Sequence, residues 1–328
     1  MNTFGRIFRI HIFGESHGET TGVLIDGCPA GIRLSPGDLT EDLAKRRPGA
    51  KGTTGRLEKD IPHIRSGLYK GFTTGTPILI EFENENTDPG QYEQFITVPR
   101  PGHVDFVASK KYSGYNDGRG SGHFSGRLTI GIVAAGVIAK KILKGVNFNT
   151  SVIEIGGKKR YRKLVEDTAK EGDSLGGIIE CRINQLPLCL GEPFFYSVES
   201  AVSQILFAIP SVKGVEFGAG FKASCMRGSD YNDTIVENTG RTESNNSGGI
   251  TGGLTNGNQI VFRTAMRPPS SIGKKQMSFD LKTSKSTILS IEGRHDVCHA
   301  LRSSIIIEAA ASIALCDLYL ISNRYSEN

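Results

Sequence analysis

Hydrophobic and polar residues alternate along several short segments in the first quarter of the chain, as they do in half-buried β-strands. Four such segments predict strands, at residues 6–13, 22–25, 61–68 and 77–82. The charged segment 36–45 has the spacing of a short helix, with Ser35 as its expected N-cap. The polar, turn-rich segments 46–55 and 84–122 predict loops.

Two later segments, 128–143 and 303–321, are apolar on all sides. Lysines end the first and two carboxylates interrupt the second, so both predict helices buried inside protein rather than membrane spans. A helix at 197–207 and strands at 177–183, 214–221 and 259–264 lie between them along the chain. Helices without a polar face must be covered on more than one side. We therefore predict an α+β fold, with a central helical layer between antiparallel-rich sheets, rather than a doubly wound parallel sheet.

Composition narrows the class of protein. Of the 328 residues, 38% are hydrophobic and 22% are charged, which is typical of a globular protein with a substantial core. The six cysteines show no C-x-x-C pair and no zinc-ligand spacing, which predicts free thiols in a reducing compartment and no metal site. The N-terminal residues contain no apolar signal region. We expect a cytoplasmic protein that binds no membrane.

The segment Gly14-Glu15-Ser16-His17-Gly18 fits the Gly-x-Ser-x-Gly pattern of a hydrolase nucleophile elbow. An elbow needs a helix directly after the serine, yet residues 20–25 are rich in β-branched side chains and predict a strand. The segment is therefore expected to be a loop that presents Ser16 and His17. A serine hydrolase that uses Ser16 with His103 or His295 stays as an alternative.

Three histidines stand beside glycine and arginine, in segments 14–18, 100–105 and 293–296. A histidine in such a loop can face a ligand and titrate near neutral pH. Basic residues crowd the loop 46–56, and a glycine-rich segment with Ser125 precedes the first apolar helix, as in anion-binding helix N-termini. Arginines from distant segments suggest a small, multiply anionic substrate. Nucleic-acid binding is a second alternative, disfavoured by 39 basic against 34 acidic residues and by the absence of tryptophan.

Taken together and in order, these segments resemble the chorismate synthase family. The resemblance runs from the first strand to the last helix, through residues 13–18, 23–29, 46–49, 100–105, 125–127, 212–217, 247–257, 267–271 and 293–296. It implies a single domain over residues 1–328, with the family's β-α-β sandwich assembled as a homotetramer.

The resemblance also implies a reaction. Members of the family catalyse the anti-1,4 elimination of phosphate from 5-enolpyruvylshikimate-3-phosphate to give chorismate, in the shikimate pathway of aromatic amino acid biosynthesis. The reaction needs reduced FMN without net redox change: the flavin donates an electron transiently, phosphate leaves and a hydrogen is removed from C6. Two sources of reduced flavin stay open, namely NADPH, with Arg46 as the residue that would contact it, and an external flavin reductase.

By resemblance, each expected site residue has a role. His17 protonates the departing phosphate, His103 acts on the reduced flavin near N1, and Asp296 handles the proton at N5. The anionic groups of the substrate are assigned to Arg46, Lys51, Arg100, Arg127 and Arg294. The flavin is assigned to His123, Phe124, Ser125, Pro210, Ser211, Gly252, Arg267, Pro268, Pro269, Ser270, Ser271 and Arg294.

Four positions depart from the family pattern. Lys51 stands where relatives have an arginine, which keeps the charge but loses the bidentate fork. Arg267 replaces a usual lysine, His123-Phe124-Ser125 replaces Arg-Ser-Ser, and Pro210-Ser211 replaces a pair such as Asn-Ala. These departures concern individual contacts, and the expected activity is unchanged.

Overall fold

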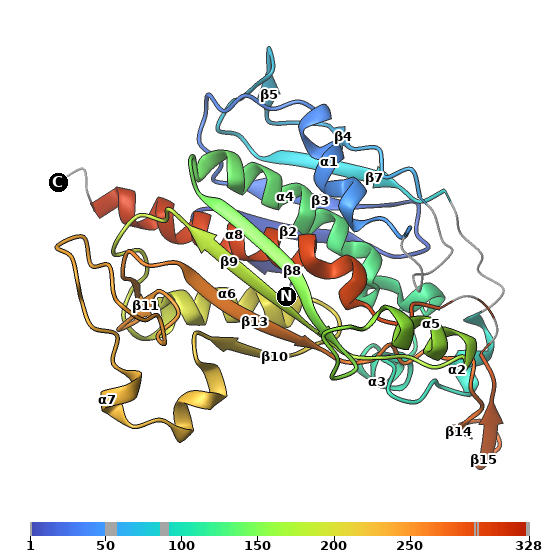
Figure 1. Ribbon diagram of the computed structural model, residues 1–328. Coiled ribbons are helices and arrows are strands. Elements are labelled where there is room, and N and C mark those ends of the chain that lie inside the picture. Colours follow the sequence, from blue (N-terminus) through green and yellow to red (C-terminus); the bar gives the residue numbers. More distant parts are fainter. Residues whose placement is uncertain (1, 50–57, 86–91, 292, 294, 326–328) are drawn as a thin grey trace.

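Two antiparallel sheets enclose a layer of helices (Figure 1). The computed structural model describes residues 2–49, 58–85, 92–291, 293 and 295–325. The layered arrangement confirms the predicted α+β fold, with its helices between sheets.

The first sheet has the strand order β1-β2-β3-β7-β4. Its strands are β1 (Thr3–Phe4), β2 (Arg9–Gly14), β3 (Thr20–Asp26), β7 (Ile78–Glu83) and β4 (His63–Ile64). The strand predicted at 61–68 is largely irregular, since only β4 and the start of a hairpin, β5 (Leu68–Tyr69) with β6 (Phe72–Thr73), are extended. β3 follows Gly18 and pairs with β2, so the helix that a nucleophile elbow requires is not there.

The second sheet has the order β10-β13-β9-β8. Its strands are β10 (Val212–Phe217), β13 (Ile260–Met266), β9 (Gly177–Asn184) and β8 (Asn147–Ile155). The hydrophobic pattern misses β8, because this edge strand alternates exposed with half-buried residues over most of its length. It also misses α5 (Arg162–Lys170), a segment for which the sequence pattern predicts no helix.

The helical layer consists mainly of α4 (Thr129–Ile142) and α8 (Ala300–Tyr325), which pack against each other. A Cβ atom at Gly136 would lie 2.4 Å from Cβ of Ala309, so the two helices approach at a distance that only glycine permits. α8 is long and apolar enough to cross a membrane by length and composition alone, but 72% of its apolar window is buried inside the protein. α4 and α8 are thus core helices, as predicted, and α6 (Val198–Ala208) packs beside α8.

Two helix aspartates bind the chain segments that lead into β2 and α1. Asp317 on α8 accepts hydrogen bonds from the backbone N–H groups of Arg6, Ile7 and Phe8, at 2.7 to 2.9 Å, and so anchors the turn that leads into β2. At α1 (Gly37–Arg46), the predicted Ser35 cap is wrong. The amide and hydroxyl of Ser35 instead donate to the carboxylate of Asp38, which reaches back from the first turn.

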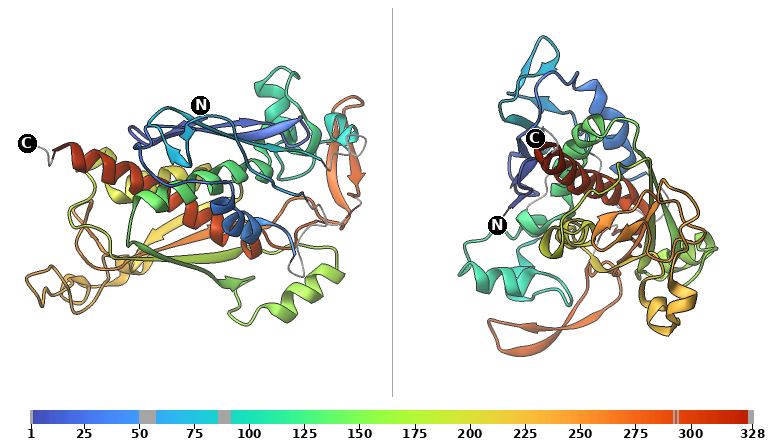
Figure 2. Two further views of the ribbon diagram at one scale, coloured as in Figure 1. Left: turned by 90° about the horizontal axis from the view of Figure 1, so that it is seen from above. Right: turned by 90° about the vertical axis from the view of Figure 1, so that its left-hand side faces the viewer.

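The remaining elements are short, and several lie near one end of the layer (Figure 2). They are α2 (Gln94–Thr97), α3 (Asp105–Lys111), η2 (Arg119–Phe124), η3 (Gly126–Leu128), η4 (Phe194–Tyr196), η5 (Gly220–Cys225), α7 (Gly228–Tyr231), and the hairpins β11 (Ile250–Thr251) with β12 (Leu254–Thr255) and β14 (Gln276–Asp280) with β15 (Lys285–Leu289). The β14–β15 hairpin projects from the body and is attached to the α2 region by a hydrogen bond from Leu281 N–H to the carbonyl of Thr97.

Candidate active site

A cavity of about 870 Å³ lies where α4 and α8 both begin. Its lining comes from segments far apart in the sequence: residue 16, and residues within 46–48, 58–60, 92–103, 120–129, 209–211, 267–271, 290–291 and 295–306, with Gly293. Most of the residues expected from the sequence lie on its wall: Arg46, Arg100, His103, Phe124, Ser125, Arg127, Pro210, Ser211, Arg267, Pro269, Ser270, Ser271 and Asp296. Lys51 and Arg294 lie outside the described residues.

His17 lies directly behind the cavity wall. Gly120, which lines the cavity, has a φ of +55°, and a Cβ atom there would lie 2.4 Å from Cδ2 of His17. The imidazole also meets the ring of the lining residue Tyr92 edge to face, at 5.0 Å between centroids. A glycine at position 120 therefore lets the His17 ring approach the cavity closely.

Three expected flavin contacts are not on the wall of this cavity. The ring of His123 lies 2.8 Å from the carbonyl oxygen of Gly14 and 3.1 Å from Oδ1 of Asn2. Gly252 lies in the turn between β11 and β12, and Pro268 sits between two lining residues without lining the cavity itself.

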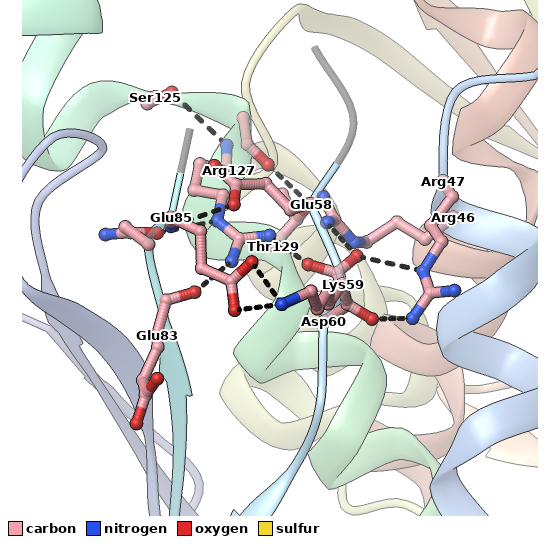
Figure 3. A network of polar contacts seen from close by, with 12 residues as sticks. Arg46, Arg47, Glu58, Lys59, Asp60, Glu83, Glu85, Ser125, Arg127 and Thr129 are labelled. Carbon is pink, nitrogen blue, oxygen red and sulfur yellow. Dashed lines mark hydrogen bonds and ion pairs between the residues drawn. The ribbon is translucent and has the colours of Figure 1, made fainter. Parts of the chain in front are cut away.

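Buried arginines meet one aspartate on the α1 side of the cavity (Figure 3). Oδ2 of Asp60 accepts a hydrogen bond of 2.9 Å from Nη2 of Arg46, and Oδ1 accepts one from Nη1 of Arg127. Nε of Arg47 lies 3.6 Å from Oδ2. Arg127 also donates from Nε to Asn84, at 2.9 Å. The carboxylate thus joins the end of α1 to the segment that precedes α4.

Burial and charge shift the pKa values of this cluster in a consistent way. Burial lowers the pKa of Arg46 to about 10, against the opposing attraction of Asp60, and the group remains a cation at neutral pH. Burial alone would raise the pKa of Asp60, but Arg46 and Arg127 outweigh it and hold that pKa below its usual value. Arg46 and Asp60 are therefore both ionised at neutral pH.

A second aspartate, Asp105, supports the predicted histidine. Oδ1 of Asp105 lies 2.6 Å from Nδ1 of His103, and Nε2 of His103 lies 2.9 Å from the hydroxyl of Ser121. Arg100 binds both oxygens of the same carboxylate, at 2.8 Å each. Desolvation lowers the pKa of His103 although Asp105 favours its charged form, so the imidazole is mainly neutral at neutral pH. Nε2 of His103, the nitrogen that a catalytic histidine would turn toward a nucleophilic serine, meets Ser121, and Ser16 lines the same cavity.

Asp296 lies near the start of α8. Its Oδ2 accepts a hydrogen bond of 2.7 Å from Nη2 of Arg302 and lies 3.6 Å from Nε2 of His299. Nδ1 of His299 lies 2.7 Å from the hydroxyl of Ser211. Burial lowers the pKa of His299 to about 4, so the ring is neutral at neutral pH, with Nδ1 facing Ser211 and Nε2 facing Asp296. Ser211, a departure from the family pattern, thus has a defined contact here.

The sequence profile of the chorismate synthase family matches residues 8–320. The chain belongs to the chorismate synthase family. A chorismate synthase of Chitinophaga pinensis is 51% identical over 325 residues, covering 99% of this chain and 98% of the relative. One of Korarchaeum cryptofilum is 40% identical, covering 98% of each chain. A solved structure described as chorismate synthase matches with a TM-score of 0.75 at 25% identity, over 97% of this chain and 93% of the other.

As a member of the chorismate synthase family, the protein is a lyase of aromatic amino acid biosynthesis that acts on a small molecule. The cavity suits an anionic one. Among the described residues, five arginines and three carboxylates line it. The arginines are Arg46, Arg100, Arg127, Arg267 and Arg302, and the carboxylates are Glu58, Asp60 and Asp296. The excess of cations favours a ligand with several negative charges.

Sequence reasoning missed five of the polar residues in and around this candidate site: Asp60, Asp105, Ser121, His299 and Arg302. Asp105 falls inside the predicted segment 100–105, and its spacing of two residues from His103 was a usable signal. His299 and Arg302 follow Asp296 by three and six residues, so their closeness in the sequence to an expected site residue was a usable signal. Asp60 gives no local signal, because its partners are 14 and 67 residues away.

Proposed function

We propose that the chain catalyses the anti-1,4 elimination of phosphate from 5-enolpyruvylshikimate-3-phosphate to give chorismate, with reduced FMN as cofactor. One observation carries this proposal: a single cavity gathers His103, Asp296 and five arginines, with His17 directly behind its wall. An elimination that expels phosphate needs cations for its anions and acids or bases for its protons.

The cavity has room and suitable chemistry for FMN beside a substrate. Its volume of about 870 Å³ lies in the range of cofactor pockets. Apolar side chains that could face a flat ring, Phe124, Ile209 and Ile306, lie on the same wall as polar groups that could hold a phosphate, Arg267 and Ser271. When bound, reduced FMN supplies a transient electron to the substrate.

The protein's own residues divide the remaining tasks. His17 donates a proton to the leaving phosphate. His103, mainly neutral at neutral pH, can accept a proton, and Asp105 stabilises the imidazolium that results. Asp296, on the same wall, would hold or accept a proton beside N5 of a bound flavin. Cations at Arg46, Arg100 and Arg127 bind the phosphate and carboxylates, and their burial strengthens these interactions.

The decisive experiment compares the two redox states of the flavin. Anaerobic enzyme with chemically reduced FMN is expected to release phosphate from 5-enolpyruvylshikimate-3-phosphate and to form chorismate, and oxidised FMN is expected to support neither. Equal rates in both states would contradict the proposal. Ser16→Ala is expected to cost far less than loss of a hydrolase nucleophile would, and fluorophosphonate labelling of Ser16 would favour that alternative instead.

We also propose a cytoplasmic homotetramer built from single-domain chains. Light scattering on the purified protein measures the assembly. The source of electrons is tested by aerobic turnover with NADPH and FMN, without dithionite or added reductase. Turnover under these conditions indicates that the enzyme reduces its own flavin, with Arg46 as the first residue to test for NADPH contact. Absence of turnover indicates an external reductase.

A further inference from the structure

Asp60 occupies the point where two of the expected substrate-binding arginines meet (Figure 3). Its two carboxylate oxygens accept hydrogen bonds from different guanidinium groups. Oδ2 accepts from Arg46, and Oδ1 accepts from Arg127. The side chains of Arg46, Asp60 and Arg127 are 4%, 1% and 5% exposed. All three also line the cavity. A phosphate or carboxylate that binds these arginines therefore meets a negative charge already in contact with them.

The two arginines differ in what they can still offer. Arg127 uses three of its five N–H donors, on Asn84, on Asp60 and on the carbonyl of Glu83 at 3.3 Å. Nε of Arg46 is shielded from solvent and has no hydrogen-bond partner among the described residues. An anion in the cavity would therefore approach Arg46 through its terminal nitrogens, which donate to Asp60 alone among the described residues. Arg46 is thus the side of the cluster that remains ready for a ligand.

The charge of the cluster depends on Asp60. Arg46 and Arg127 carry two positive charges, which the carboxylate reduces to one. Two buried guanidinium groups without a counter-charge would repel each other and would lack compensation for lost hydration. Asp60 removes that penalty while the cavity holds no other anion. The same charge repels an anion that arrives later.

We propose that Asp60 is the resident counter-anion of this subsite and sets how tightly the subsite holds phosphate or carboxylate groups. It keeps Arg46 and Arg127 in position before a ligand binds. Its charge then weakens the binding of the anion, so that inorganic phosphate leaves more readily than it would from two arginines alone. This inference rests on the proposed function only for the identity of the anion as substrate or product.

The test measures binding of inorganic phosphate by isothermal titration calorimetry, with no flavin or substrate and in a buffer free of other oxyanions. Asp60→Asn preserves the shape of the side chain and removes its charge. We expect this variant to bind phosphate about tenfold more tightly than the natural chain, since removing one nearby repulsion remains worth about 1.4 kcal/mol after screening. A folded Asp60→Asn protein that binds phosphate no more tightly would overturn the proposal.

Two further variants keep the test decisive if Asp60→Asn does not fold. Arg127→Gln leaves Arg46 and Asp60 with no net charge, and the double variant Asp60→Asn/Arg127→Gln restores the net charge of one. Affinity for phosphate should therefore be lowest for Arg127→Gln and close to the natural value for the double variant. A double variant that binds phosphate no better than Arg127→Gln contradicts the proposal.

Asp42→Asn is the matched control. Asp42 is also buried, and its carboxylate pairs with Lys140 and, at 3.3 Å, with Lys45, but it does not line the cavity. We expect this variant to lose stability and to keep its affinity for phosphate. If it gained affinity as Asp60→Asn does, the effect would be one of net charge alone and the proposal would be wrong. This experiment measures binding and needs no turnover. A negative result would therefore not contradict the proposed elimination reaction. In the same way, absence of that reaction would not contradict the binding result.

Discussion

Asp60 and Asp105 are both buried aspartates that bind arginine beside the same cavity, yet their surroundings give them different tasks. Asp60 has only arginines as its charged partners among the described residues, so no group in its cluster changes charge near neutral pH. Asp105 shares its charge between Arg100 and His103, and the imidazole can gain or lose a proton. The comparison shows that one residue type can hold a fixed charge in one place and support proton transfer in another, according to its partners.

The largest expected effect is on stability at Asp60. Asp60→Ala leaves two buried guanidinium groups without a counter-charge, and we expect the free energy of unfolding to fall by about 3–5 kcal/mol. Urea denaturation followed by circular dichroism measures the change. A loss below about 1 kcal/mol would mean that water or other groups already compensate the charges of the two arginines. Asp60 would then not be needed as a fixed counter-charge, and the contrast with Asp105 would not hold.

The next effect is on turnover at the histidines. His103→Ala and His17→Ala should each lower the rate of chorismate formation by about 10²-fold, within the range of general acid–base contributions. His63→Ala is the control, because His63 lies on β4 and is not among the residues that line the cavity. Full turnover in both site variants would assign proton transfer to other groups and leave Asp105 with a structural role only.

A pH titration of stability separates the two clusters further. The pKa of His103 is lowered on folding, so below the unfolded value of about 6.5 the unfolded chain takes up a proton that the folded chain does not. Stability should therefore fall on acidification from pH 6.5 toward the folded pKa, by at most about 1.4 kcal/mol per pH unit from this group. His103→Gln should remove that contribution, whereas Asp60→Asn should not alter the slope in this window. An unchanged slope in His103→Gln would show that His103 is not desolvated in the folded protein.

The smallest effect concerns Ser121, whose hydroxyl lies against His103. Ser121→Ala removes that contact and should cost about 1 kcal/mol of unfolding free energy. Ser121 has a φ of +73°, which glycine adopts without strain, so Ser121→Gly should be less destabilising than Ser121→Ala although both lack the hydroxyl. Differential scanning calorimetry resolves the two variants. The reverse order would mean that the added freedom of glycine in the unfolded chain outweighs the relieved strain.

Sequence reasoning worked best where the signal is local or repeated. The buried helices α4 and α8 were predicted because each lacks a polar face, and β2, β3 and β7 because their residues alternate. It failed at β8, an edge strand without a buried stripe over most of its length, and at the Ser35 cap, where the Ser35 hydroxyl donates to Asp38 instead of accepting from the first turn of the helix. Most of the cavity wall followed from the family resemblance, but no segment by itself indicated which arginine faces which acid.

The sequence alone determined the order of strands and buried helices, the family, and the gathering of histidine, arginine and glycine in the segments that line the site. These properties depend on neighbouring residues, or on motifs a few residues long. Only the tertiary structure decided that Asp60 stands between Arg46 and Arg127, that His17 lies against Gly120, and that Nε2 of His103 meets Ser121. Such contacts join residues from 14 to 103 positions apart, and the electrostatic energy of a buried charge depends on those distant partners rather than on its own segment.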